Sequence, residues 1–386
     1  MSRAKRRVVW IILLLGGVGW PPLAQSGLIQ SGLAQSGRRP QGRNGEAEKP
    51  VIRIETLEVV LPLLAYDANG RFIDDLKPQE VLVLEEKESR QVVSLKREPA
   101  NIVLILDGSN EVGTFKNGPT RRYGSEERPV WAKSETASML ANPTAREFAE
   151  KFLAALSPRD EVAIIQYADR VQLLQDWTRD SAKATGALHS GYRVGIRSTY
   201  YDALQLAATK LGEKPEGRRI VVLLTDGVDS ASKSGRTKAL RALEHSRAIV
   251  FVVGWAEALR REIELAVGWM RGHESFTSAS ASRLGELKSY LSRLEGTEVE
   301  LRQLADGSGG IMWLPQSHGE VVTSFRPLAE EIGAQYSLSF ATERRPSLED
   351  RRMIEVIPAR PGMTLRSRRS YLADEEESRK RIMGNR

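Results

Sequence analysis

The sequence predicts an α/β fold in which helices cover both faces of a mostly parallel sheet, with a smaller β-rich module beside it. Two uninterrupted apolar runs, 102–106 and 220–224, are typical of strands buried on both faces. Strands and helices alternate between residues 98 and 334, which favours parallel pairing through helical crossovers. Residues 51–97 and 335–372 instead show the two-residue alternation of half-buried strands.

The composition is that of a soluble globular protein. The 386 residues are 41% hydrophobic and 28% charged, and cysteine is absent. The lack of cysteine excludes disulfides, thiolate metal ligands and cysteine nucleophiles. The formal net charge is +7, but four of the basic residues lie within the first seven positions. No basic stripe with interleaved aromatic residues is present, so the sequence gives no indication of nucleic-acid binding.

Residues 1–24 have the pattern of an export signal. Basic residues precede an apolar stretch from Val8 to Trp20, and Pro21-Pro22-Leu23-Ala24 ends it near small residues. The apolar stretch is shorter than the roughly 20 residues that span a bilayer. We therefore expect a periplasmic or secreted protein with no membrane span after cleavage; an uncleaved N-terminal anchor is the alternative.

The β-rich segments flank the predicted α/β domain. Residues 25–50 form a low-complexity linker in which Gln-Ser-Gly recurs. Residues 51–97 predict three to five strands, with a turn at Asp67-Ala68-Asn69-Gly70. Residues 335–372 predict further strands that pair with 51–97, and residues 373–386 form a charged tail.

The α/β domain is expected to span residues 98–334 and to carry two insertions. A polar insertion at 112–142 follows the first strand, and a helical insertion occupies 256–306. The expected strands are 101–106, 161–167, 171–174, 220–224, 248–254 and 310–314, and the expected helices outside the insertions are 143–156, 181–189, 201–211, 237–246 and 321–335.

Polar oxygen-bearing residues follow the buried strands. Asp107 and Ser109 come directly after the first apolar run, and Asp226 follows the second. Ser198 and Thr199 stand just before a predicted helix, where a hydroxyl can cap the helix and still face the crevice. Because the carboxyl ends of parallel strands meet at one sheet edge, we expect these side chains to lie close together. Carboxylates, hydroxyls and waters are the ligands of Mg²⁺, so a magnesium (or manganese) site is predicted.

Three motifs in this order give the chain a recognisable likeness. Asp107-Gly-Ser109, Ser198-Thr199-Tyr-Tyr-Asp-Ala-Leu and Leu224-Thr225-Asp226-Gly227 resemble a von Willebrand factor type A domain with its metal-ion-dependent adhesion site. The flanking segments resemble a bacterial subfamily often found in acidobacteria; these are Asp67–Arg71, Leu174–Asp180, Gly307–Gly310 and Arg368–Tyr371. The resemblance covers residues 51–372 and implies a Rossmann-like fold that displays a divalent cation to a protein partner.

Two ligand positions remain open. The family motif is Asp-x-Ser-x-Ser, but Glu111 occupies its third position. Glu111 either coordinates the cation itself or is too long for its slot and leaves the site empty. Counted back from Tyr201-Asp202 without gaps, Ser198 falls on the family threonine, whereas residue type favours Thr199. By the resemblance, Asp226 is the distal ligand.

The chemistry favours a binding module, not an enzyme. Ser109 is not in a Gly-x-Ser-x-Gly motif, no phosphate-binding Gly-rich loop is present, and no histidine is placed as a base for Ser109. We expect an exported, adhesion-type module whose cation meets an acidic side chain of a protein partner. The alternatives are an interaction scaffold of the same fold with a degenerate, metal-free site, and a metal-dependent hydrolase acting on phosphoesters.

Overall fold

The computed structural model describes residues 57–110, 120–123, 126–129, 142–214, 216–271, 278–342 and 351–372, all within one compact unit that begins at Ile54. The predicted export signal, the linker, Glu111 and the charged tail lie outside the described residues. Within the polar insertion, β6 (Thr120–Tyr123) and β7 (Glu126–Pro129) form an antiparallel pair.

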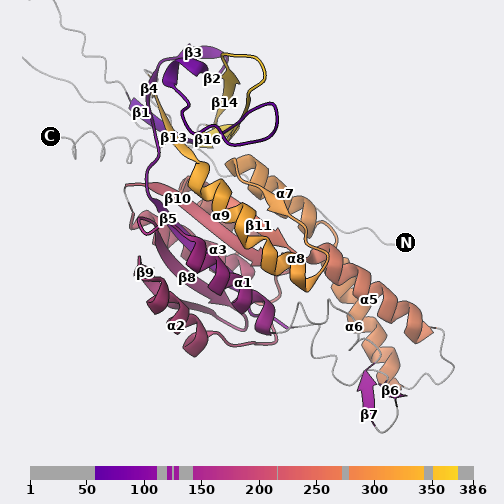
Figure 1. The fold of residues 1–386 in the computed structure, drawn as a ribbon. Helices are drawn as coiled ribbons and strands as arrows, with labels where there is room; N and C mark the ends of the chain where they lie inside the picture. The colour runs from indigo at the N-terminus through magenta and orange to yellow at the C-terminus, as the bar shows by residue number, and fades with distance from the viewer. Residues whose placement is uncertain are drawn as a thin grey trace, which may run out of the picture. The chain divides into compact units, whose positions relative to one another are not determined.

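A six-stranded sheet forms the centre of the α/β domain (Figure 1). Its order is β12 (Met312–Trp313), β11 (Ile249–Gly254), β10 (Arg218–Thr225), β5 (Ala100–Asp107), β8 (Glu161–Tyr167) and β9 (Val171–Thr178). Every neighbouring pair is parallel except β8 and β9, which form an antiparallel hairpin. The predicted fold class, a mostly parallel sheet with helices and an additional β module, is confirmed.

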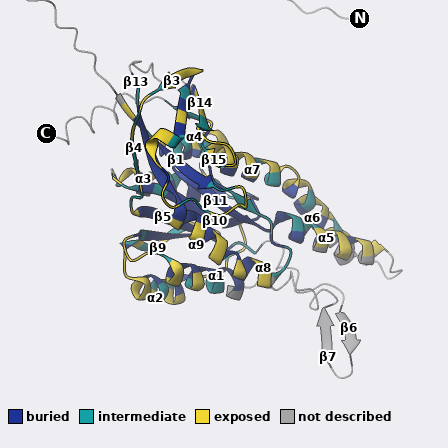
Figure 2. Ribbon diagram, turned by 45° about the horizontal axis from the view of Figure 1, so that its top comes forward, coloured by how far each residue is buried: buried dark blue, intermediate teal, exposed yellow. Residues whose placement is uncertain are grey.

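Helices cover both faces of this sheet, and β5 shows why its apolar run is continuous. Ile102, Leu104 and Leu106 pack into a core with α1 (Asn142–Ala155), α2 (Ser181–Gly191), α8 (His318–Thr323) and α9 (Phe325–Ala334). Val103 and Ile105 pack on the opposite face against α3 (Tyr200–Gly212), α4 (Arg236–His245) and α7 (Thr297–Ser308). Successive strand residues point to opposite faces, so all of them must be apolar. Figure 2 shows the buried strands between helices whose outer faces are exposed.

Helices α5 (Ala256–Arg271) and α6 (Ser278–Leu294) pack against each other apart from the sheet. Their shared core contains Leu259 and Ile263 of α5, and Leu287 and Leu294 of α6. Val228, which closely follows β10, belongs to the same cluster. The two helices therefore pack onto the chain segment that leaves the end of β10, and we call them the α5–α6 hairpin.

The β-rich module combines strands from both sides of the α/β domain in the sequence. One sheet has the order β15 (Thr364–Ser367), β1 (Leu57–Tyr66), β13 (Tyr336–Thr342) and β4 (Val92–Lys96); the other has the order β16 (Ser370–Leu372), β14 (Arg351–Pro358), β2 (Val81–Glu85) and β3 (Glu88–Arg90). A 3₁₀ turn at Pro78–Glu80 precedes β2. Their inward residues share one core, which includes Leu61, Val83, Phe340 and Ile354.

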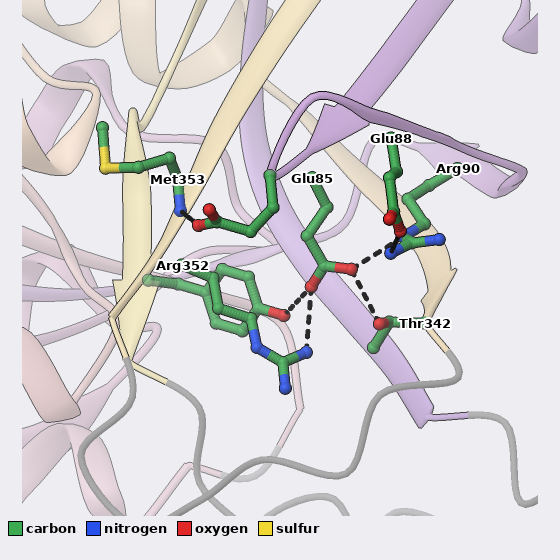
Figure 3. Close-up of polar contacts among 8 residues, drawn as sticks. Glu85, Glu88, Arg90, Thr342, Arg352 and Met353 are labelled. Carbon is green, nitrogen blue, oxygen red and sulfur yellow. Dashed lines mark hydrogen bonds and ion pairs between the residues drawn. The ribbon is translucent and has the colours of Figure 1, made fainter.

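A buried charged cluster lies inside this module (Figure 3). Glu85 has no exposed side-chain surface, and its carboxylate accepts bonds from Arg90 at 2.7 Å, Thr342 at 2.8 Å and Arg352 at 3.1 Å. Tyr371 donates to the same carboxylate. A buried charge is tolerated when it is paired and fully hydrogen-bonded, and Glu85 meets that condition.

Several predicted elements differ in extent: the strand expected at 171–174 continues to Thr178, and proline accounts for two other differences. The expected helix at 321–335 is divided into α8 and α9 around Ser324. Pro327 lies in the first turn of α9, where its missing N–H does no harm, but it cannot continue a preceding helix. The expected strand at 310–314 pairs with β11 over two residues only. Pro315 follows closely and cannot donate a ladder hydrogen bond.

Candidate functional site

The two predicted aspartates follow adjacent parallel strands. Leu106 of β5 pairs with Leu224 of β10, so Asp107 and Asp226 emerge at the same sheet edge. Asp107 is 6% exposed and Asp226 is 1% exposed. Burial, followed by the nearby charge of Asp226, raises the pKa of Asp107 well above its usual range. Two like charges held close in a buried place favour the arrival of a cation or a proton.

Ser109 is positioned by Asp107 itself. The Asp107 Oδ1 atom accepts the Ser109 backbone N–H at 2.8 Å and its hydroxyl at 2.6 Å. Between them, Gly108 passes so close to Arg193 that a Cβ added there would lie 2.9 Å from the Arg193 carbonyl oxygen. A glycine is therefore required for the loop to leave the strand on this path.

Asn110 adds an oxygen that the sequence analysis did not select. Its Oδ1 atom is buried and accepts no hydrogen bond from the described residues. A buried carbonyl oxygen without a donor is unfavourable unless a ligand or an ion satisfies it. Asn110 follows Ser109 directly, so this oxygen is a further candidate donor for a hard cation.

Ser198 and Thr199 connect two strand ends. The Ser198 hydroxyl donates to the Val228 carbonyl at 2.7 Å, after β10, and the Thr199 hydroxyl donates to the Ala168 carbonyl at 3.0 Å, after β8. Thr199 is the N-cap residue of α3 by position but forms no side-chain capping bond, so the suggested capping role of Thr199 is wrong. Each hydroxyl donates its hydrogen to a carbonyl oxygen, and its own oxygen lone pairs remain available to a cation.

The same loop also reaches the Asp107 segment. The Gly195 N–H donates to the Gly108 carbonyl at 2.9 Å, and the Tyr192 hydroxyl donates to the Asp107 carbonyl at 2.6 Å. The structure therefore brings five of the six predicted site residues to one edge of the sheet. The sixth, Glu111, lies outside the described residues.

Asp226 is held from two sides. Its Oδ1 atom accepts the Val228 N–H at 2.9 Å, and its Oδ2 atom accepts the hydroxyl of Tyr290 from α6. Gly227 has a φ of +80°, the left-handed conformation that lets the chain turn back over the carboxylate. The sequence pattern does not single out Tyr290, which lies three residues after Leu287 and four before Leu294 on the apolar face of α6.

Buried tyrosine and threonine hydroxyls lie beneath the site. Tyr167, at the end of β8, pairs with Asp107 across the parallel ladder, and its hydroxyl lies 2.6 Å from the Thr225 hydroxyl. The Thr225 hydroxyl also accepts the Gly227 N–H at 2.8 Å. These contacts fix the ends of three neighbouring strands relative to one another. The apolar strand pattern gave no signal for them because a buried tyrosine at a strand end resembles ordinary core.

The donor set fits a hard divalent cation. Asp107, Asp226, Ser109, Ser198 and Thr199 supply carboxylate and hydroxyl oxygens, the ligand types of Mg²⁺ and Mn²⁺. Among the described residues, no group of three or more acidic, histidine or cysteine side chains is arranged around one point. A two-carboxylate site of this kind would depend on hydroxyls and waters for its remaining ligands, which Mg²⁺ commonly retains.

One cavity of the described structure lies away from these residues. It encloses about 1390 Å³ between the β module and the ends of α7 and α9, and its lining includes Tyr66, Asp306, Glu331 and Arg366. None of the predicted cation ligands lines it. The candidate site is therefore defined by the chemistry at the strand ends and not by the size of a pocket.

Comparison with known proteins finds a family that matches part of the α/β domain. Residues 135–228 match the family described as von Willebrand factor type A domain. Domains of this family commonly take part in adhesion or protein interactions. No curated protein matches the chain.

Several solved structures resemble this one weakly. A von Willebrand factor type A protein from Catenulispora acidiphila is 11% identical with a TM-score of 0.40, covering 83% of this chain and 75% of its own. An aerotolerance-related membrane protein from Bacteroides fragilis is 17% identical with a TM-score of 0.37, covering 60% and 98%. The von Willebrand factor domain of a type V pilus tip protein from Porphyromonas gingivalis is 14% identical with a TM-score of 0.27, and the match spans 35% of this chain and 40% of the pilus chain. Likeness at this level says nothing about the site or its ligand.

Among the described residues, no helix combines the length and the apolar character needed to cross a membrane.

Proposed function

We propose that this von Willebrand factor type A domain holds a divalent cation, Mg²⁺ or Mn²⁺, and presents it to an acidic side chain of a protein partner outside the cytoplasm. The observation that carries the proposal is the pair of buried carboxylates, Asp107 and Asp226, at the ends of adjacent strands. Burial, followed by the repulsion from Asp226, raises the pKa of Asp107, and a divalent cation would relieve that repulsion.

The hydroxyls around the pair support the same proposal. Ser109, Ser198 and Thr199 would supply neutral oxygens, and Asn110 an unsatisfied carbonyl oxygen. Glu111 would either join this set or exclude the partner's carboxylate, and the assignment between Ser198 and Thr199 stays open. When bound, the cation would supply positive charge that attracts an anionic group of a partner.

The rim of the site supports a protein partner. Val194 is 38% exposed and Ile196 is 58% exposed, on the same loop whose Gly195 contacts Gly108. Exposed apolar side chains beside a charged centre are typical of an interface in which apolar contacts surround a polar anchor and exclude water from it. The proposal also includes export, to the periplasm or out of the cell. It further includes membership of the bacterial subfamily that the flanking segments resemble.

Titration calorimetry with Mn²⁺ tests the cation site directly. Wild type is expected to bind, and Asp107→Ala is expected to lose binding because it removes one of two carboxylates. Asp176→Ala is a matched control, since Asp176 is an exposed aspartate of β9 paired with Lys210 at 2.6 Å, and it should bind as wild type does. Absence of binding by wild type would overturn the proposal.

A metal-free interaction scaffold is the second candidate. It is favoured by Asp226, whose two oxygens both accept hydrogen bonds from the protein itself. This candidate predicts that Asp226→Ala leaves capture of a partner unchanged, whereas the cation proposal predicts its loss. A hydrolase is the least supported reading, and activity against generic phosphoesters with Mn²⁺ would be needed to revive it.

A further inference from the structure

Tyr290 connects the α5–α6 hairpin to the candidate site. Its ring is 4% exposed and packs in the hairpin core beside Leu287, Leu294 and Val228. Its hydroxyl reaches out of this apolar cluster and donates to Asp226 Oδ2. The guanidinium of Arg293 lies over the same ring, 4.9 Å from its centroid. The ring is thus held by neighbours from α6 and from the loop after β10.

The polar end of this side chain makes one specific contact. The other residues that α6 buries in the cluster, Leu287 and Leu294, fill the core without a polar group. A buried tyrosine hydroxyl needs a hydrogen-bond partner, and here that partner is the 1% exposed carboxylate of a candidate cation ligand. The hairpin therefore delivers one polar atom to one ligand.

The hydroxyl and a backbone N–H together orient the Asp226 carboxylate. An ionised carboxylate has about four lone-pair directions. The Val228 N–H takes one on Oδ1 and the Tyr290 hydroxyl takes one on Oδ2. The two donors, one on each oxygen, fix the plane of the carboxylate. Donors in this relation to a metal ligand typically orient it and strengthen its binding.

We propose that Tyr290 is a positioning residue of the cation site: its hydroxyl holds Asp226 in the orientation that the cation requires, and the α5–α6 hairpin is thereby part of the site. This inference rests on the proposed function, because it concerns the same cation. Coupling between two sites is reciprocal, so a cation bound at Asp226 must in turn stabilise the attachment of α6. The stability of the α5–α6 hairpin then depends on whether a cation is bound.

Calorimetry with Mn²⁺ on Tyr290→Phe tests the positioning role. Phenylalanine keeps the ring in the hairpin core and removes the hydroxyl only, so Mn²⁺ affinity is expected to fall about tenfold. Tyr66→Phe is the matched control. The Tyr66 hydroxyl, at the end of β1, donates to both carboxylate oxygens of Glu331 on α9 at 2.9 and 2.8 Å, and its loss should leave Mn²⁺ affinity unchanged.

A second measurement follows the α5–α6 hairpin directly. Hydrogen exchange of wild type with and without Mn²⁺ is expected to show slower exchange of the amides of residues 287–294 when the metal is present. In Tyr290→Phe, the protection should be lost while the protection around Asp107 remains.

The outcomes separate the two proposals. If wild type binds no Mn²⁺, the proposed function and the role of Tyr290 fall together. If wild type binds and Tyr290→Phe binds equally or more tightly, the cation site stands and the positioning role is overturned. Unchanged exchange of residues 287–294 on Mn²⁺ binding by wild type would overturn the coupling to the hairpin.

Discussion

Two buried carboxylate groups in this protein have different surroundings. Glu85 in the β module is surrounded by Arg90, Arg352, Thr342 and Tyr371, all of which donate to it (Figure 3). Asp107 in the α/β domain receives bonds from Ser109 and faces a second carboxylate, Asp226. Among the described residues, Asp107 forms no ion pair with a lysine or an arginine.

The difference is the one expected between a structural charge and a candidate cation ligand. Burial by itself raises the pKa of Glu85, but its four donors outweigh that effect and leave the pKa below its usual value of 4.5. Burial and a like charge instead raise the pKa of Asp107. In the β module the charge of Glu85 is balanced by arginines of the protein itself. At the strand ends of the α/β domain, the negative charge would be neutralised by a bound cation.

The largest expected effect is the loss of the Glu85 charge. Glu85→Gln keeps the size of the side chain but leaves Arg352, which is 4% exposed, without its carboxylate, so the free energy of unfolding should fall by about 3 kcal/mol. Urea denaturation measures it. Glu88→Gln is the control: the Glu88 side chain is 52% exposed and pairs with Arg90 at 2.8 Å, and its loss should cost less than about 1 kcal/mol. Equal losses in the two variants would contradict the structural role of Glu85.

The same cluster predicts a dependence on pH. The folded pKa of Glu85 is lower than its unfolded value, so its stabilisation is present above about pH 4.5 and is lost as the pH falls through the folded pKa. The difference in unfolding free energy between wild type and Glu85→Gln should therefore shrink on acidification. Urea denaturation of both proteins at pH 7 and at several values below 4.5 gives that difference. A gap that stays constant with pH would show that the charge of Glu85 is not its cause.

The sequence predicted the two aspartates better than their surroundings. Asp107 and Asp226 stand out because each ends an uninterrupted apolar run, and parallel strands bring such ends together. Tyr290 was not predicted, because a tyrosine on the apolar face of a helix gives the same sequence pattern whether or not its hydroxyl binds a site residue. Glu85 continues the inward positions of Val81 and Val83, yet Thr342 and Tyr371 lie 257 and 286 residues away. No local pattern can reveal partners so distant in the chain.

A smaller effect of opposite sign is expected at Asp107. Asp107→Asn keeps an oxygen for Ser109 and removes the repulsion with Asp226, so the metal-free protein should gain about 1.5 kcal/mol of unfolding free energy. The same variant should lose Mn²⁺ binding. Thermal unfolding with chelator present and with Mn²⁺ separates the two effects. A metal-free protein that is less stable than wild type would show that Asp107, like Glu85, is a structural charge, and the contrast between the two groups would fail.

The smallest expected effect concerns the hairpin turn that carries the Glu85 cluster. Glu86 and Lys87 connect β2 to β3 with φ angles of +51° and +68°, which non-glycine residues adopt at a cost. Lys87 is exposed, so Lys87→Gly should relieve the strain and raise the free energy of unfolding by about 0.5 kcal/mol after the entropy of glycine is deducted. Glu86→Gly is the informative comparison, because the Glu86 carboxylate also accepts the Met353 N–H at 2.5 Å. The loss of this hydrogen bond should cancel the stability gained from relieving the strain. Urea denaturation of both variants would show whether turn geometry contributes to the β module beyond the charges of Glu85 and its donors.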